Sequence, residues 1–374
     1  MNVTALDRKV LKYMDSFKLE QIVEPLLGWF GSHARILPWR EEPTAYRVWV
    51  SEIMLQQTRV EAVKPYYERF MNVLPNVAAL AEADEETLLK LWEGLGYYNR
   101  VRNLGKAARQ VMELYQGIIP DEYEELCKLA GIGSYTAGAV ASIAYGKPVP
   151  AVDGNVLRVI SRVRMDDRDI MQAKVRKSVE DDLRRIMPEG RSGAFNQALM
   201  ELGAIVCIPN GEPKCSECPW NGFCRACANQ CMSQFPKKAP KKARTIEYKT
   251  ILVLQDAQKA ALQKRPDKGL LAGMYEFPWL EGTQNEDYVL NYLKGIGLHA
   301  VRIQKLEDSK HIFTHKEWHM TGYAVRVDEL ENNTADNLIF VDKEEAEERY
   351  AIPSAYAAYT KYLQIRQGSE KLRD

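Results

Sequence analysis

Hydrophobic residues recur at helical spacing along most of the chain up to about residue 206. Apolar side chains three and four residues apart predict a helix over 22–30. The same spacing predicts helix over 46–70, where Pro65 is placed to begin a second segment. An alanine-rich run after Gly133 and the apolar run 194–206 predict two more helices. The first part of the chain is therefore predicted to be all-α.

The pattern changes after residue 244. Short strand-like runs at 249–254 and 259–264 precede GLLAGMYEFPW, a helix-like segment near Leu290 and further strands around 322–327. This mixture predicts an α+β domain. The stretch 234–244, with two prolines and five basic residues, is typical of a linker. We therefore predict a first domain at 1–232, a basic linker at 233–246 and a second domain at 247–374.

Composition changes this picture little. The 374 residues suit two domains, and 46% hydrophobic and 27% charged residues are an ordinary globular mixture. Lys plus Arg and Asp plus Glu both number 51, which does not exclude a nucleic-acid partner, because the distribution of positive charge decides binding. The charged N-terminus resembles no signal peptide, and no apolar run approaches the roughly 20 residues that span a bilayer. We expect a cytoplasmic protein without a membrane partner.

The stretch 129–155, LAGIGSYTAGAVASIAYGKPVPAVDGN, carries the first chemical signal. Gly131 and Gly133 allow a tight turn, and the free N–H groups of the helix that follows form a cradle for one phosphate. About twenty residues later, Asp153 lies at the mouth of the next predicted helix. A predicted phosphate-binding turn followed by a carboxylate suggests chemistry on a nucleic acid. An ordinary turn before a core helix has the same sequence pattern.

Three other segments combine polar, aromatic and cationic residues. RILPWR (35–40) is either a surface loop with one buried indole or the wall of a base-sized pocket. Gln56-Gln57-Thr58 either contacts base edges or only ends a helix, and WEGLGYYNRVR (92–102) either stacks on bases or packs on a helix. Phe313-Thr314-His315 lies in a predicted turn between strands, where it is either structural or able to read a base.

Glu52 lies among apolar residues of its predicted helix. If its side chain faces solvent, it has no special role. If it is buried, the loss of solvation raises its pKa, and the protonated carboxyl can act as a general acid near neutral pH.

Six of the seven cysteines lie between Cys207 and Cys231. The first four, at Cys207, Cys215, Cys218 and Cys224, follow the spacing C-x7-C-x2-C-x5-C. This compact spacing predicts a metal site rather than a disulfide framework. Spacing alone leaves both tetrahedral zinc and an iron–sulfur cluster open.

In combination, these segments closely resemble the MutY-type adenine DNA glycosylases of the helix-hairpin-helix superfamily. The resemblance covers the chain from about residue 29 almost to 319. It is carried by RILPWR, VWVSEIMLQQTRVE, EGLGYYNR, LAGIGSYTAGAV, PAVDGNVLRV, FNQALMELGA, the cysteine loop, GLLAGMYEFP and IFTH.

The resemblance implies a monomeric enzyme that hydrolyses the N-glycosidic bond of adenine paired with 8-oxoguanine or guanine in double-stranded DNA. An abasic site would remain. It implies a fold with an all-α helix-hairpin-helix glycosylase domain and a C-terminal α+β Nudix-like domain. It also implies a [4Fe–4S] cluster on Cys207, Cys215, Cys218 and Cys224, and activity on the nucleoid of a bacterium.

The resemblance assigns roles residue by residue. Glu52 corresponds to the acid and Asp153 to the family's aspartate, with Tyr135 and Asn155 as supporting polar groups. The adenine pocket would be formed by Arg35, Leu37, Trp39, Arg40 and Gln197. Contacts to DNA and to 8-oxoguanine would come from Gln57, Thr58, Tyr97, Gly131, Gly133, Phe313, Thr314 and His315.

Position 135 separates this interpretation from its nearest rival, the endonuclease III-like pyrimidine glycosylases. Those relatives carry a lysine there that forms a Schiff base with the sugar, which Tyr135 cannot do. The second domain lacks the run of glutamates that binds catalytic magnesium in Nudix hydrolases, so we expect it to read 8-oxoguanine.

Three features depart from the family pattern. The first cysteine gap holds seven residues where six are expected, and Thr314 stands where serine is common. Cys227 and Cys231 have no role in the pattern. An inactive mismatch-binding protein is the remaining alternative from another functional class.

Overall fold

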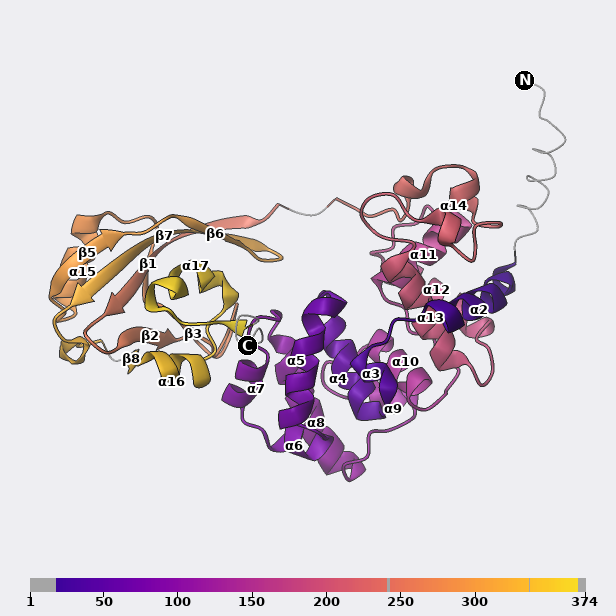
Figure 1. Cartoon of the computed structure of the whole chain (residues 1–374), viewed down its shortest axis with the longest axis horizontal. Helices are drawn as coiled ribbons and strands as arrows, with labels where there is room; N and C mark the ends of the chain where they lie inside the picture. Colours follow the sequence, from indigo (N-terminus) through magenta and orange to yellow (C-terminus); the bar gives the residue numbers. More distant parts are fainter. Residues whose placement is uncertain (1–17, 241–242, 336, 369–374) are drawn as a thin grey trace, which may run out of the picture. The chain divides into compact units, whose positions relative to one another are not determined.

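The computed structural model describes residues 18–240, 243–335 and 337–368 (Figure 1). The charged N-terminal stretch and positions 241–242 of the predicted linker lie outside the described residues. The packing of the chain divides it into two compact units, each of which is described by itself. The first contains the chain up to Gln57 together with Asn76–Ala81 and Lys106–Pro240, and the second contains Thr58–Pro75, Glu82–Gly105 and the C-terminal part. This division does not test the predicted domain boundaries, which stay predictions.

The helical part of the chain contains the predicted helices. The helices are α2 (Val23–His33), α3 (Pro38–Glu41), α4 (Ala45–Leu55), α5 (Val60–Val73), α6 (Val77–Glu82), α7 (Glu85–Leu91), α8 (Asn99–Tyr115), α9 (Tyr123–Leu126), α10 (Ser134–Ile143), α11 (Gly154–Arg164), α12 (Ala173–Arg185), α13 (Ser192–Ile205) and α14 (Arg225–Ala228). Short 3-10 turns precede α2 at Leu19–Ile22 and lie in the cysteine loop at Cys215–Glu217 and Met232–Gln234.

The prediction that Pro65 begins a helix is wrong. Pro65 lies inside α5, which already begins at Val60. The carbonyl of Arg59 accepts from the N–H groups of Ala62 and Val63, both at 3.1 Å, so the first turn is complete before the proline. The proline only removes one hydrogen bond of the helix ladder.

The core of the first unit lies between α2, α11 and α13. Each helix contributes one apolar stripe, as periodicity predicts. The stripes contain the fully buried residues Ile22, Leu26, Val156, Ile160, Phe195, Leu199 and Leu202. Helix α10 packs against both α4 and α13, so the alanine-rich helix lies between the two.

The second unit contains an eight-stranded mixed sheet among its described residues, with β3-β2-β1-β7-β5 as its main order. The strands are β1 (Thr245–Gln255), β2 (Ala260–Lys264), β3 (Tyr275–Glu276), β4 (Trp279–Glu281), β5 (Ala300–Lys305), β6 (Ser309–Ile312), β7 (Lys316–Val327) and β8 (Leu338–Val341). The long central strands β1 and β7 are parallel, with Ile251 opposite Gly322. Off this order, β4 pairs with β1, β6 with β7 and β8 with β2.

Alternate residues of β1 point to opposite faces of the sheet, and each face has its own core. Ile251 and Val253 pack on one face with aromatic residues of the C-terminal segments. Leu252 and Leu254 pack on the other face with α15 (Glu286–Gly295). The C-terminal segments contain α16 (Lys343–Glu348), α17 (Ala357–Thr360) and three 3-10 turns at Leu330–Asn332, Ser354–Tyr356 and Lys361–Leu363. This architecture confirms the predicted α+β domain.

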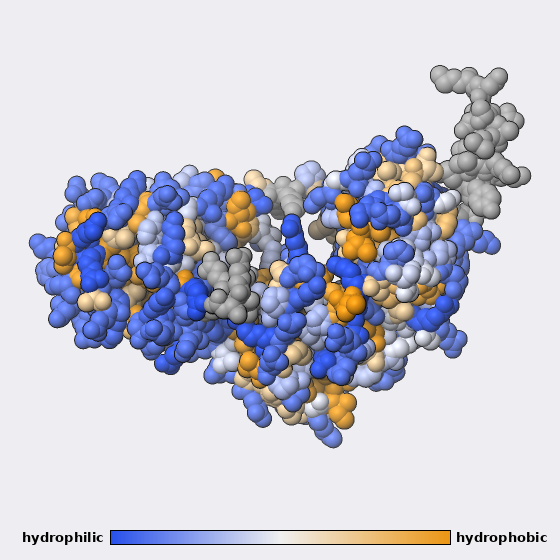
Figure 2. Space-filling model, viewed as in Figure 1, coloured by the Kyte–Doolittle hydropathy of each residue, from blue (hydrophilic) through white to orange (hydrophobic). Residues whose placement is uncertain are grey.

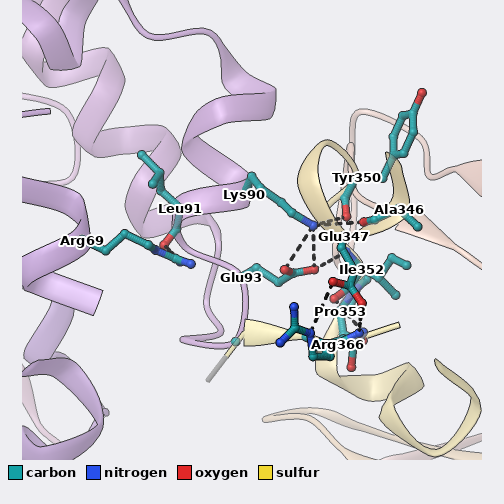
Figure 3. Close-up of polar contacts among 12 residues, drawn as sticks. Arg69, Lys90, Leu91, Glu93, Ala346, Glu347, Tyr350, Ile352, Pro353 and Arg366 are labelled. Carbon is teal, nitrogen blue, oxygen red and sulfur yellow. Dashed lines mark hydrogen bonds and ion pairs between the residues drawn. The ribbon is translucent and has the colours of Figure 1, made fainter. Parts of the chain in front are cut away.

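Within the second unit, the end of α7 is joined to the C-terminal segments by a buried ion pair (Figure 3). Lys90 lies 3.2 Å from Glu93 and donates to the carbonyls of Tyr350 at 2.6 Å and Ala346 at 3.2 Å. Glu93, only 2% exposed, accepts from the N–H of Ile352 at 2.9 Å. Residues 82–105 therefore share a packing unit with the sheet domain.

The surface in Figure 2 is mostly hydrophilic, with separate small hydrophobic patches. Among the described residues, no helix combines the length and the apolar character required to cross a membrane.

Candidate active site

Glu52 is buried in the first unit because it lies among the apolar residues of α4. Val50, Ile53 and Met54 are all buried, and Glu52 between them is 6% exposed. The helix begins at Ala45, and the hydroxyl of its N-cap, Thr44, accepts a hydrogen bond from the N–H of Arg47 at 3.3 Å. Of the two predictions for Glu52, the buried one is confirmed.

Burial raises the pKa of Glu52 from 4.5 to about 7, because the charged form loses its solvation. A hydrogen bond from Tyr135 and the positive charge of Arg40 both lower this pKa, and the negative charge of Asp153 raises it. A carboxyl group with a pKa near 7 can hold and release a proton at neutral pH.

Tyr135, on α10, donates a hydrogen bond from its hydroxyl to the carboxylate of Glu52. The same hydroxyl lies 3.2 Å from the sulfur of Met200 on α13. Burial raises the pKa of Tyr135 well above 10, so the phenol stays protonated and remains a donor. Tyr135 therefore orients the acid without exchanging its own proton.

Asp153 occupies the N-cap of α11. Its carboxylate accepts from the N–H of Val156 at 2.7 Å and from the side-chain amide of Asn155 at 2.7 Å. Burial raises the pKa of Asp153, whereas these hydrogen bonds and the charge of Arg158 lower it. Asp153 and Tyr135 are only half-buried, so the side of the site that they form is open to solvent.

Arg158, which was not predicted, links Asn155 to the cysteine loop. This 7% exposed guanidinium donates to Asn155 Oδ1 at 2.8 Å and to the carbonyl of Cys207 at 2.9 Å. It also donates to the carbonyl of Gly203 at 2.8 Å. A Cβ on residue 203 would lie 2.6 Å from that of Asn155, so glycine allows this close approach of α13 to α11.

The four predicted cysteine ligands line one small cavity, part of it open to solvent. Two donors approach their sulfurs: Arg162 Nη1 lies 3.3 Å from Cys207 Sγ, and the N–H of Trp220 lies 3.4 Å from Cys218 Sγ. Such donors stabilise thiolates, the form that binds metal. In the described chain, no three His, Cys, Asp or Glu side chains are arranged to hold a metal ion.

Glu201, which was not predicted either, holds both arginines of the RILPWR segment. Its carboxylate, in a residue 1% exposed on α13, lies 2.7 Å from Arg35 Nε and 2.9 Å from Arg40 Nη2. It also accepts from the N–H of Arg35 at 3.1 Å. The hydrogen bonds from both arginines keep the pKa of Glu201 below its usual value although burial opposes this.

We expect Glu201→Ala to lower the free energy of unfolding by about 3 kcal/mol, because it leaves two partly buried guanidinium groups without their carboxylate. Urea denaturation measures this loss. Glu24→Ala is the control, since Glu24 pairs with Arg191 at the surface. A Glu201→Ala protein as stable as the control would contradict a structural role for this carboxylate.

The remaining predicted pocket residues surround this segment. Leu37 and Trp39 are 2% and 6% exposed, so their side chains pack into the domain. Arg35, Arg40 and Gln197 are half-buried. The described contacts place Arg35 and Arg40 together through Glu201, and no described contact joins Gln197 to them.

At the predicted phosphate cradle, a glycine turn leads directly into a helix. Gly131 has a positive φ of 74°, which favours glycine. Gly133 is the N-cap of α10 and makes no side-chain cap, so the first N–H groups of this helix face outward.

Gln57 and Tyr97, predicted to contact DNA, share an unusual backbone. Both have positive φ values, 60° and 51°, which cost side chains of this kind free energy of about 1 kcal/mol or more. Both side chains are exposed.

In the second unit, the structure brings Tyr97 to the predicted turn 313–315. The hydroxyl of Tyr97 lies 3.4 Å from Thr314 Oγ1, and Arg100 donates to Thr58 at 3.5 Å. Phe313, Thr314 and His315 form the turn between β6 and β7, which the N–H of Phe313 closes on the carbonyl of Lys316 at 2.8 Å. The ring of Phe313 packs edge-on against Trp318, with centroids 4.7 Å apart, so Thr314 and His315 remain exposed.

Comparison with known proteins agrees with this geometry. Residues 50–185 match the HhH-GPD superfamily of base excision DNA repair proteins, and residues 250–362 match the NUDIX domain. The adenine DNA glycosylase of Mus musculus is 37% identical over 368 residues, which cover 83% of this chain and 71% of that protein. The chain belongs to the adenine DNA glycosylase family. The predicted family is confirmed.

Other adenine DNA glycosylases and one solved structure extend this result. The adenine DNA glycosylase of Buchnera aphidicola subsp. Acyrthosiphon pisum (strain APS) is 31% identical over 84% of this chain and 88% of its own length. The structure of a thermostable thymine-DNA glycosylase covers 60% of this chain with 26% identity and a TM-score of 0.50. The predicted fold, a helical helix-hairpin-helix domain followed by a Nudix-like domain, is confirmed.

Proposed function

We propose that this chain hydrolyses the N-glycosidic bond of adenine paired with 8-oxoguanine, or with guanine, in double-stranded DNA. The observation that carries the proposal is the pair of carboxyl groups on α4 and α11. Glu52 has a pKa of about 7; burial also raises the pKa of Asp153, but the hydrogen bonds from Val156 and Asn155 and the charge of Arg158 oppose this rise and favour the charged form. Two carboxyl groups with different protonation states are what glycosidic bond cleavage requires.

The proposed reaction uses each group once. Glu52 donates its proton to N7 of an adenine that has been rotated out of the duplex, which turns the base into a good leaving group. Tyr135 keeps the acid in position through its hydrogen bond. As the bond breaks, the sugar becomes a cation that the carboxylate of Asp153 stabilises, and water then attacks it to leave an abasic site.

The cysteine cavity fits the proposed [4Fe–4S] cluster. The four proposed ligands line it together with Cys227, and Arg162 and the N–H of Trp220 supply donors to sulfur. We propose Cys207, Cys215, Cys218 and Cys224 as the ligands. The bound cluster would act structurally, by cross-linking the loop that continues α13.

The proposed DNA contacts lie in both units. The N–H groups of the first turn of α10, after Gly133, would bind one phosphate, and Gln57 and Tyr97 would enter the duplex. Phe313, Thr314 and His315 would read 8-oxoguanine. The monomeric state and the cytoplasmic location stay predictions.

Single-turnover assays on matched duplexes test the proposal. Adenine opposite 8-oxoguanine should be released at least about 100-fold faster than adenine opposite thymine, because a mispaired base costs less to rotate out of the stack. A duplex with an oxidised pyrimidine opposite guanine should stay intact. Release of the pyrimidine would favour the endonuclease III-like alternative, and binding without release of any base would favour the inactive mismatch binder.

We expect borohydride to trap no covalent adduct between the protein and the mispaired duplex. Position 135 carries a phenol that cannot form a Schiff base with the sugar. Denaturing electrophoresis after borohydride treatment measures the adduct, and a bifunctional endonuclease III-like enzyme serves as positive control. A trapped adduct as strong as in the control would contradict a monofunctional mechanism.

A further inference from the structure

The cavity beside α14 is lined by one cysteine more than the proposed ligand set. Cys227 lines it together with Cys207, Cys215, Cys218 and Cys224. Cys231 differs from Cys227, because its buried side chain packs with Ala226 and Phe235 in a separate small core. The two cysteines without a role in the family pattern therefore lie in different environments.

Cys227 contacts two of the proposed ligands. Its thiol forms a hydrogen bond with the thiol of Cys215, and its backbone N–H forms one with Cys224. The sulfur of Cys227 also lies 3.5 Å from Asn221 Oδ1, and Asn221 lines the same cavity. The thiol thus lies within hydrogen-bonding distance of Cys215.

The two thiols are held by backbones of different kinds. Cys215 follows residues 208–214, a mostly exposed connection in which Gly211 has a positive φ of 78°. Cys227 lies in α14, which Cys224 caps and which the fully buried Ala226 anchors. Of the four proposed ligands, Cys215 therefore stands beside a better-anchored thiol that could replace it.

We propose that Cys227 is a reserve ligand that binds the iron atom of Cys215 when Cys215 is removed or dissociates. This inference rests on the proposed cluster site. The exchange needs no oxidant: the bond from iron to Cys215 breaks, the bond from iron to Cys227 forms, and the proton that leaves the Cys227 thiol is taken up by Cys215. The number of thiolates on the cluster stays the same.

Iron and sulfide analysis of variants of the full chain tests the exchange. Cys215→Ser should keep most of its iron, whereas Cys215→Ser/Cys227→Ser should hold at least about 10-fold less, because losing even an outer-shell partner of a ligand lowers metal affinity that much. Cys215→Ser/Cys231→Ser is the matched control and should behave like Cys215→Ser. If Cys215→Ser alone loses as much iron as the Cys215→Ser/Cys227→Ser variant, the proposal is wrong.

Alkylation shows directly which thiol is bound. In the wild-type protein, iodoacetamide should modify Cys227, and in iron-loaded Cys215→Ser it should no longer do so, as read by peptide mass spectrometry. Modification of Cys227 to the same extent in both proteins would overturn the proposal. In Cys218→Ser, Cys227 should stay reactive, because its thiol hydrogen-bonds with Cys215 and not with Cys218.

If Cys215→Ser does not fold, the proposal can still be tested by the rate of iron loss from proteins that keep all four proposed ligands. Cys227→Ser should lose iron to a chelator several times faster than wild type or Cys231→Ser, and equal rates in all three proteins would contradict the proposal. If the wild-type protein contained zinc and no sulfide, the proposed iron–sulfur cluster would be wrong, but the proposed ligand exchange would not be. The same variants, analysed for zinc, would then still test the exchange.

Discussion

Replacing Glu52 with glutamine is expected to slow adenine release by about 1,000-fold or more, the range that a positioned general acid supplies. The amide has nearly the shape of the carboxyl group and can still accept the hydrogen bond of Tyr135. It has no acidic proton to give to the base. DNA binding should stay close to wild type.

Single-turnover kinetics across pH measure this effect. The wild-type rate should fall as pH rises through about 7, because the protonated fraction of Glu52 falls there. The Glu52→Gln protein should be slow at every pH and should lack this limb of the profile. A variant that keeps the wild-type rate would remove the acid from the mechanism.

The same substitution is expected to change how stability depends on pH. The pKa of Glu52 is about 7 in the folded protein and 4.5 in its ordinary state, so the unfolded chain releases this proton first as pH rises. Wild-type stability should therefore fall between pH 4.5 and pH 7 by about 3 kcal/mol relative to Glu52→Gln. Urea denaturation at both pH values measures this difference, and parallel stability curves would contradict the burial of an ionisable group.

Replacing Asp153 with asparagine is expected to slow adenine release by about 100-fold to 1,000-fold, the size of a lost electrostatic contact to a developing charge. Asparagine caps helices as well as aspartate, so the hydrogen bond from Val156 should persist and the fold should hold. The substitution thus removes the charge and leaves the cap.

Asp84→Asn is the matched control for this variant. Asp84 caps α7 through the N–H of Thr87 at 2.7 Å, the same distance as the cap from Asp153 to Val156. Asp84→Asn should release adenine at the wild-type rate in a single-turnover assay. If both variants slowed equally, or if neither slowed, the charge of Asp153 would have no special role.

Sequence periodicity anticipated much of the fold because the helices and strands here have clear apolar faces. The apolar residues around Glu52 and the N-cap position of Asp153 could be predicted from the sequence, because both depend only on residues nearby in the chain. The turn at 313–315 is local in the same way. Pro65 shows the limit, because a helix can begin earlier and tolerate a proline.

The parts of the site that escaped prediction depend on partners distant in sequence. Glu201 binds Arg35 across 166 positions, and nothing in FNQALMELGA distinguishes its glutamate from an exposed one. In the sequence, Arg158 is a charged residue among the apolar residues of VLRVISRV. An arginine at such a position can equally well face solvent. Its contacts to Asn155 and Cys207 require the folded approach of α11 and α13.

The ion pair of Lys90 and Glu93 has a consequence for constructing fragments of this enzyme. A chain truncated after residue 240 would keep Glu93 but lose the N–H of Ile352 and the carbonyls of Ala346 and Tyr350. The truncated chain would then expose Lys90 and Glu93 without these partners, on the surface where residues 82–105 normally pack against the sheet domain. Isolated catalytic fragments should therefore aggregate more readily than the full-length enzyme, and the role proposed for the C-terminal domain is better tested by point substitutions in its 313–315 turn than by deletion.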